Sequence, residues 1–180
     1  FFYERWIDVT ALVDEFSALT WRELDYKKEV ANALYFYEHY RNHSVLFIPK
    51  TYKELSTKNM IVQEYVGGIA ATDLLRMRMQ SGQYREWLLN QYHTDIYFII
   101  RRISYDTMWQ VFNLDLFYSD HHPGNIKILP NNKYALVDFG IVGQSPKDKR
   151  NYYEILKLLT ENADQVDAMR LGKAFFKFGA

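Results

Sequence analysis

Apolar residues recur at helical spacing along much of the chain. Between about residues 8 and 41 they lie three or four positions apart, and neither Gly nor Pro interrupts this stretch. The same spacing runs over about 74–80 and, after a Ser-Gly pair, over about 84–113. Two more helices are predicted over about 147–160 and 164–178. The pattern therefore predicts a mostly helical chain whose longest helix covers 84–113.

Short apolar runs between the helical stretches predict strands. Three of them, at about 45–49, 51–55 and 60–66, lead to the Gly-Gly pair at 67–68. A fourth segment, 126–137, carries apolar residues on both sides of a Pro-Asn-Asn turn and predicts a β-hairpin. Together, these elements indicate the α+β class.

Three polar residues at the ends of this hairpin segment have the types and spacing needed for phosphoryl transfer. Asp120 and Asn125 precede the predicted hairpin, and Asp138 follows it. The hairpin would return Asn125 and Asp138 to one end. Carboxylate and amide oxygens are the ligands that Mg²⁺ prefers, and a further carboxylate can accept a proton from the attacking hydroxyl. We therefore predict Asp120 as the catalytic acceptor and Asn125 and Asp138 as metal ligands.

Two other interpretations of this region were weighed. Asn and Asp are common in turns for local reasons, so the segment could be a purely structural helix, turn and hairpin. His121 and His122 could suggest a transition-metal site, but no third His or Cys follows at ligand spacing. We expect both to be structural loop histidines.

Four runs of the chain resemble, in order, motifs of the UbiB/ADCK (AarF-type) family of atypical protein-kinase-like proteins. They are Glu-Leu-Asp with Glu-Val-Ala-Asn within 23–33, the predicted strands over 48–68, Tyr-Ser-Asp-His-His-Pro-Gly-Asn at 118–125, and Asp-Phe-Gly within 136–143. In two places the sequence departs from the family pattern. Tyr118 stands where the family has His, and His121 stands where it has Pro. Neither change removes a predicted metal or phosphate ligand.

The resemblance implies a protein-kinase-like bilobal fold with a mostly helical large lobe and a truncated small-lobe sheet. Residues 1–66 would be the C-terminal part of the small lobe, and 67–180 the large lobe. No Gly-rich nucleotide loop or strand lysine precedes residue 15, so we expect a fragment that lacks the N-terminal part of the small lobe.

The resemblance also implies a nucleotide site. Adenine would lie against backbone groups of the hinge at Glu64, Tyr65 and Val66, although a simple strand-to-loop turn explains that segment equally well. Glu23 and Asp25 would belong to a feature that crowds the nucleotide and disfavours ordinary protein phosphorylation.

Composition narrows the class of partner. Lys plus Arg number 22 and Asp plus Glu number 22, so the net charge is zero, and we expect no nucleic-acid partner. The chain has no Cys, which excludes disulfides and zinc–thiolate sites and fits a reducing compartment. No apolar run reaches the ~18 residues of a spanning helix. We expect a cytoplasmic protein, with a peripheral contact at a membrane left open.

These observations predict an ATP-binding protein with Mg²⁺-dependent ATPase or phosphoryl-transfer activity. By resemblance, it would be linked to ubiquinone or isoprenoid-lipid biosynthesis, with contact to an isoprenoid lipid or a membrane surface. Two alternatives stay open. One is a pseudokinase-like module that binds nucleotide or partners without turnover. The other is a small-molecule phosphotransferase, against which the Glu-Leu-Asp-Tyr segment argues.

Overall fold

The computed structural model describes residues 26–80, 82–147, 149 and 153. Its α-helices have nine or more residues, and its strands have four or fewer. The predicted α+β class is confirmed. In chain order the elements are α2 (Tyr26–Tyr40), β1 (Leu46–Phe47), a 3₁₀ turn (Lys53–Leu55), β2 (Ile69–Ala70), α3 (Ala71–Gln80), α4 (Tyr84–Tyr92), α5 (Ile96–Asn113), β3 (Leu116–Tyr118), a second 3₁₀ turn (Pro123–Asn125), β4 (Ile126–Leu129), β5 (Lys133–Leu136) and β6 (Val142–Gln144).

The hairpin of β4 and β5 is the centre of the larger sheet. The hairpin predicted over 126–137 is confirmed, and its register pairs Ile126 with Leu136 and Leu129 with Lys133. Asn131 and Asn132 make the turn with φ of 61° and 58°, a left-handed conformation that Asn tolerates better than most residues. β1 joins β5 in parallel and β2 joins β4 antiparallel, giving the order β1-β5-β4-β2.

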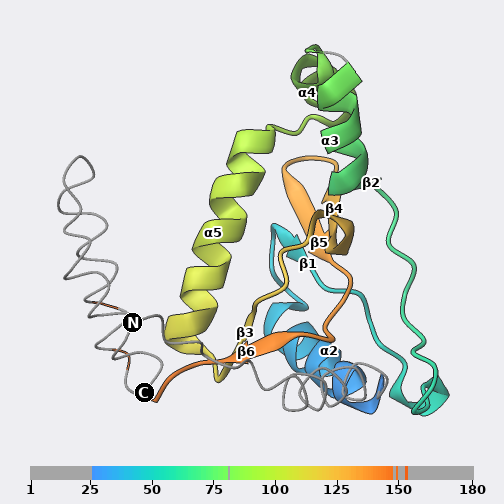
Figure 1. Cartoon of the computed structure of the whole chain (residues 1–180), viewed down its shortest axis with the longest axis vertical. Coiled ribbons are helices and arrows are strands. Elements are labelled where there is room, and N and C mark those ends of the chain that lie inside the picture. The colour runs from blue at the N-terminus through green and yellow to red at the C-terminus, as the bar shows by residue number, and fades with distance from the viewer. Residues whose placement is uncertain (1–25, 81, 148, 150–152, 154–180) are drawn as a thin grey trace, which may run out of the picture.

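The helices stand around this sheet (Figure 1). α5 runs along one side, α3 and α4 lie at one end, and α2 lies at the other end together with the two-stranded ribbon of β3 and β6. The segment between β1 and β2 runs away from the sheet and returns to it. Residues 8–25 of the first predicted helix, and nearly all of the predicted helices over 147–160 and 164–178, lie outside the described residues.

The prediction of one helix over 84–113 is wrong, because the chain breaks between α4 and α5. His93 takes a left-handed φ of 51°, and the Asp95 carboxylate caps α5 by accepting from the Tyr97 amide at 2.9 Å. The hairpin turn docks into this break. The Asn132 side chain accepts from the Asp95 amide at 2.7 Å, and the Thr94 hydroxyl is 3.1 Å from the carbonyl of Leu129. These long-range bonds outweigh the helical pattern.

Only part of the predicted strand region between 45 and 66 forms strands. Residues 46–47 do, whereas 53–55 form a 3₁₀ turn and 60–66 make isolated backbone bonds. Tyr52 donates its amide to the Val62 carbonyl at 2.9 Å. Beyond that bond, the Ser56 hydroxyl donates to the Tyr52 carbonyl at 2.8 Å and accepts from the Val62 amide at 3.0 Å. The Ser56 hydroxyl thus bonds backbone groups that would otherwise pair between two strands, and the strand pairing ends there.

An aromatic cluster connects α2 to the strands. The rings of Phe36, Tyr118 and Phe139 are each 0% exposed. Phe36 stacks on Phe139 with centroids 5.4 Å apart, and Tyr118 meets Phe139 edge-on at 5.6 Å. Such pairs contribute about 0.5–1.5 kcal/mol beyond simple burial. The cluster holds the segment after Asp138 against α2.

A buried ionic network fastens α5 to the hairpin. Asp106 is 3% exposed and accepts from Arg102 through both carboxylate oxygens, at 2.9 and 3.0 Å. The Tyr134 hydroxyl of β5 donates to the same carboxylate at 2.8 Å. Because every oxygen of this buried charge has a donor, the network fixes α5 relative to β5. None of the helices that the structure describes is long and apolar enough to cross a membrane.

Gly68 permits the close approach of β2 to β4, and its substitution tests that packing. Its φ is 90°, and a Cβ there would lie 2.5 Å from the Ile128 carbonyl oxygen. We expect Gly68→Ala to lower the free energy of unfolding by about 1–3 kcal/mol, measured by urea denaturation. At the neighbouring Gly67 a Cβ meets nothing within 4 Å, so Gly67→Ala is the matched control. Equal effects of the two substitutions would contradict this account.

Candidate active site

Asp120 and Asn125 meet in the loop that follows β3. The Asn125 side-chain amide donates to the Asp120 carboxylate, with 2.8 Å between Nδ2 and Oδ2. The other carboxylate oxygen is 3.3 Å from the His122 amide nitrogen. The turn at Pro123–Asn125 brings the two side chains together, because the Asn125 amide donates to the His122 carbonyl at 2.9 Å. Two residues that the sequence places five positions apart are thus in direct contact.

The hairpin returns Asp138 to the same place. The Val137 amide donates to the Asn125 carbonyl at 3.1 Å, one step beyond the Ile126–Leu136 pair. Asn125 and Asp138 therefore flank the open end of the hairpin on its two strands. Asp138 is half-buried, and its Oδ1 accepts from the Gly140 amide at 2.9 Å. This bond holds the carboxylate after β5 ends.

α2 adds a third acid to this cluster. The Asn32 side chain donates to the Phe139 carbonyl at 2.9 Å, and Glu29, one turn earlier, is half-buried beside Asp138. Burial, and then the charge of Asp138, raise the pKa of the Glu29 carboxyl above its ordinary value. Sequence reasoning gave Glu29 no role at the site. The signal was present, because Glu29 and Asn32 are three apart and share one helix face.

The cluster carries excess negative charge. Three carboxylates, those of Glu29, Asp120 and Asp138, lie around it, while the ion pairs formed within the described residues are all elsewhere, between Arg41 and Glu38, Arg76 and Asp73, and Arg102 and Asp106. A divalent cation fits such a site, because it would offset the repulsion between the acids.

The donor set suits Mg²⁺ held jointly with phosphates. Within the described ranges no three His, Cys, Asp or Glu side chains gather closely enough to hold a metal ion. Asn125 and Asp138 would supply two oxygen ligands to such an ion, and water and phosphate oxygens would fill the remaining positions. Mg²⁺ at nucleotide sites is commonly bound in this way.

Both loop histidines have structural partners. His122 accepts the Gly124 amide through Nδ1 at 3.1 Å, which tightens the turn before Asn125. His121 lies with Nε2 2.8 Å from the Thr107 hydroxyl, so it connects the loop to α5. Both contacts support the interpretation of these residues as structural loop histidines.

The predicted hinge residues lie on the segment between β1 and β2. The Glu64 amide donates to the Lys50 carbonyl at 2.8 Å, and its carboxylate accepts from the Lys50 amide at 3.2 Å. Tyr65 is 92% exposed. Because the Glu64 amide already donates to Lys50, the predicted contact with adenine would use the backbone of Tyr65 and Val66. Glu23 and Asp25 lie outside the described residues.

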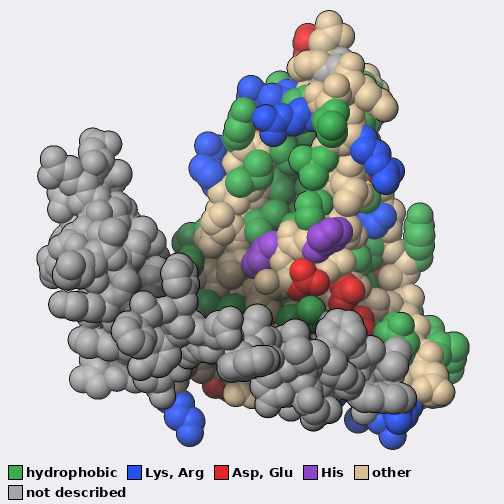
Figure 2. All heavy atoms as spheres, viewed as in Figure 1, with side chains coloured by type: hydrophobic (Ala, Val, Ile, Leu, Met, Phe, Trp, Pro, Cys, Tyr) green, Lys and Arg blue, Asp and Glu red, His purple; other side chains and the backbone are tan. Residues whose placement is uncertain are grey.

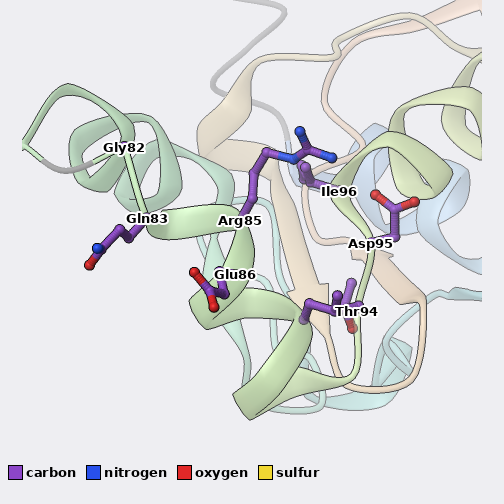
Figure 3. Close-up of a pocket in the computed structure, with 8 residues that line it drawn as sticks. Gly82, Gln83, Arg85, Glu86, Thr94, Asp95 and Ile96 are labelled. Carbon is purple, nitrogen blue, oxygen red and sulfur yellow. The ribbon is translucent and has the colours of Figure 1, made fainter.

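Two hollows lie near α5. A cavity of about 480 Å³ has a mixed polar and apolar lining from α4, the residues just before it, and the junction with α5, and it includes none of the predicted site residues (Figure 3). A groove of about 200 Å³ lies between α3, α5, β4 and the turn at Pro123–Asn125. Its lining is apolar except for Arg78 and the Tyr84 hydroxyl, and Pro123 forms part of it. In Figure 2 acidic and histidine side chains lie directly beside a broad apolar face, with basic side chains at its margins.

The raised pKa of Glu29 predicts a pH dependence of stability. A carboxyl whose folded-state pKa is raised contributes fully below the pKa of the unfolded chain, about 4.3. That contribution is lost as pH rises through the folded-state pKa. We expect Glu29→Gln, in the presence of EDTA, to raise the free energy of unfolding at pH 7, with the gain shrinking towards pH 4. Urea denaturation across this range measures it.

Glu38→Gln is the control, because Glu38 lies on the same helix and its side chain is 61% exposed. Its effect should be small and nearly independent of pH. A loss of stability in Glu29→Gln at pH 7 would contradict the prediction and indicate a cation supplied from outside the described residues.

Comparison with known proteins agrees with this geometry. The sequence profile of the ABC1 atypical kinase-like domain matches residues 1–170. The chain is 34% identical over 146 residues to a probable protein kinase UbiB of Blochmanniella pennsylvanica, covering 79% of this chain and 24% of that protein. It is 27% identical over 143 residues to Protein ACTIVITY OF BC1 COMPLEX KINASE 3, chloroplastic, of Arabidopsis thaliana, covering 79% of this chain and 18% of that protein.

A solved structure shares the fold. The Mycobacterium tuberculosis protein Rv3197, in complex with erythromycin, superposes with a TM-score of 0.67 at 24% identity, over 97% of this chain and 40% of that one. The kinase-like fold expected from the sequence is thereby confirmed. The chain spans between 18% and 26% of the length of the curated relatives that it matches. On the match over residues 1–170, the chain belongs to the ABC1 atypical kinase-like family, which includes the UbiB proteins.

Proposed function

We propose that the protein binds ATP with Mg²⁺ and transfers or hydrolyses its terminal phosphoryl group. The observation that carries this proposal is the closure of the β4–β5 hairpin, which puts Asn125 and Asp138 at one end, with Asp120 bonded to Asn125. Relatives named as probable protein kinases support it. We include in this proposal a link to ubiquinone biosynthesis. That link rests only on the resemblance to whole UbiB-type proteins and not on residues of this chain.

Each side chain has a distinct part in this proposal. The amide of Asn125 holds one oxygen of Asp120, so the carboxylate keeps a fixed orientation and can accept the proton of the attacking hydroxyl. The carbonyl oxygen of the Asn125 side chain and the Asp138 oxygen that does not accept from Gly140 would be the metal ligands. Mg²⁺, when bound, offsets the charge of the phosphates. The three carboxylates are then no longer uncompensated.

Asp138→Asn tests the metal site. Ligand at about 100 times its Kd should stabilise the wild type by roughly 2.7 kcal/mol. We expect the variant to lose the Mg²⁺-dependent part of this shift, because an amide replaces the charged ligand. Thermal unfolding with ATP, with and without Mg²⁺, measures it. Asp115→Asn is the control, since Asp115 is exposed and lies five residues before Asp120. An unchanged shift in Asp138→Asn removes Asp138 from the metal site.

Phosphate release by the wild type decides between an enzyme and a module that only binds. Turnover that needs Mg²⁺ supports the enzyme. A Mg²⁺-dependent thermal shift without any phosphate release favours the pseudokinase-like alternative.

We further propose that the acceptor or handled ligand carries an isoprenoid chain, which lies in the apolar groove beside Pro123. The groove is continuous with the catalytic loop, because α3, which lines it, also contacts the turn at Pro123–Asn125. Arg78 is exposed and lies at the groove, where it complements an anionic head group. Leu75 and Ile100 expose about half of their surface there, at 47% and 53%, so a chain can cover them.

Leu75→Glu tests this groove. A carboxylate placed against an apolar chain should weaken binding of a short prenyl diphosphate by about tenfold or more, measured by isothermal titration. Met79→Glu is the matched control, since Met79 lies one turn further along α3, is 88% exposed and does not line the groove. Equal weakening in both variants, or none in Leu75→Glu, argues that another molecule or segment occupies the groove.

A further inference from the structure

Tyr118 is held rigidly at the end of β3, two residues before Asp120. Its amide donates to the Gln110 side chain at 2.7 Å, and its residue pairs with Val142 of β6. The ring is enclosed by three others, those of Phe36, His121 and Phe139, with centroids 6.5, 5.2 and 5.6 Å away. With the side chain 0% exposed and packed on several sides, the position of its hydroxyl is set by the fold.

The hydroxyl of Tyr118 is buried, and it has no hydrogen-bond partner among the residues that the structure describes. Buried phenols nearly always have one, so this atom calls for an explanation. It lies beside the acidic cluster, because its ring meets that of Phe139, the residue after Asp138, edge-on at 5.6 Å, and Asp120 follows two residues later in the chain. The Asn125 side chain is also near it, without the geometry of a hydrogen bond. A phenol hydroxyl is protonated at neutral pH, so this one is a donor beside the acceptors of the cluster.

Asp138 is the acceptor with the most unused capacity. Asp120 already receives the Asn125 side chain and lies near the His122 amide, whereas Asp138 receives the Gly140 amide alone among the bonds within the described residues. A carboxylate that ligates a metal is commonly oriented by an outer hydrogen bond. A phenol can supply that bond without adding a positive charge beside the metal.

We propose that Tyr118 is a positioning residue whose hydroxyl donates to the Asp138 carboxylate when Mg²⁺ and nucleotide assemble the site. This inference rests on the proposed function and adds to it a residue that differs from the family pattern. Tyr118 touches neither the phosphates nor the metal. It acts by fixing the plane of the carboxylate that binds the metal.

Tyr118→Phe removes the hydroxyl and leaves the ring. In the full-length protein we expect the Mg²⁺ concentration that half-saturates the ATP-induced thermal shift to rise by about tenfold or more. Mn²⁺ bound in the presence of ATP, counted by electron paramagnetic resonance, should fall in parallel. The shift produced by ATP without metal should not change. Without ligands, the variant should be as stable as the wild type or more so, because it loses an unsatisfied buried group.

Tyr40→Phe is the matched control. Tyr40 is 4% exposed, and its hydroxyl is likewise buried with no hydrogen-bond partner among the described residues. It packs against His43 and Trp109, and the charges near it are those of Asp106 and Arg102 rather than those of the acidic cluster. It should show the same effect on unliganded stability and no change in Mg²⁺ half-saturation. If both hydroxyls had only a structural role, both substitutions would change the stability of the unliganded protein and neither would change its affinity for Mg²⁺.

Equal Mg²⁺ half-saturation in Tyr118→Phe and the wild type overturns the inference. If Tyr118→Phe folds poorly, Tyr118→His, which keeps a ring donor, decides. Half-saturation within about threefold of the wild type supports the inference, and a tenfold loss overturns it. A wild type that shows no metal-dependent shift at all contradicts the proposed function instead, so the two failures are distinguishable.

Discussion

The register of one β-hairpin decides whether this protein has a site. The bond from the Val137 amide to the Asn125 carbonyl closes the hairpin one step beyond the Ile126–Leu136 pair. Side chains alternate between the two faces of a strand. If β4 and β5 were paired one residue out of register, the side chains at the ends of the hairpin, beside Asn125 and Asp138, would therefore face the opposite side of the sheet. The left-handed turn and the alternating burial along β4 hold this register, while β5 is buried at three successive positions.

The rest of the fold acts on this hairpin from its two ends. At the turn end, Asn132 and Thr94 connect it to the break between α4 and α5. Along its length, the Asp106 carboxylate joins α5 to Tyr134. At the open end, the aromatic cluster of α2, β3 and the residue after Asp138 fixes the direction of the chain as it leaves the sheet. The hairpin is thus held at its turn, along its length and at the open end, where the site lies.

Charge, rather than shape, distinguishes the site. The cluster concentrates acids from α2, the loop after β3 and the end of β5, and the ion pairs of the described chain lie elsewhere. Burial there raises the pKa of Glu29, which is a sign of repulsion and poor solvation in the ligand-free state. Repulsion between clustered carboxylates is tolerated at functional sites, where a bound cation and its ligand would remove it. This is why an unpartnered phenol beside Asp138 is more informative than either of the hollows near α5.

The sequence by itself determined the hairpin, the α+β class, the helical character of the segments that form α2 to α5, and the return of Asn125 and Asp138 to one end of the hairpin. All of these follow from local periodicity, turn chemistry and spacing, which act over a few residues. Tertiary structure alone decided the break of the predicted helix over 84–113, the loss of strands between 51 and 66, and the approach of Glu29 and Tyr118 to Asp138. Each of these depends on a specific contact or burial in the folded chain. The local pattern showed at most which residues share a helix face, as it did for Glu29 and Asn32.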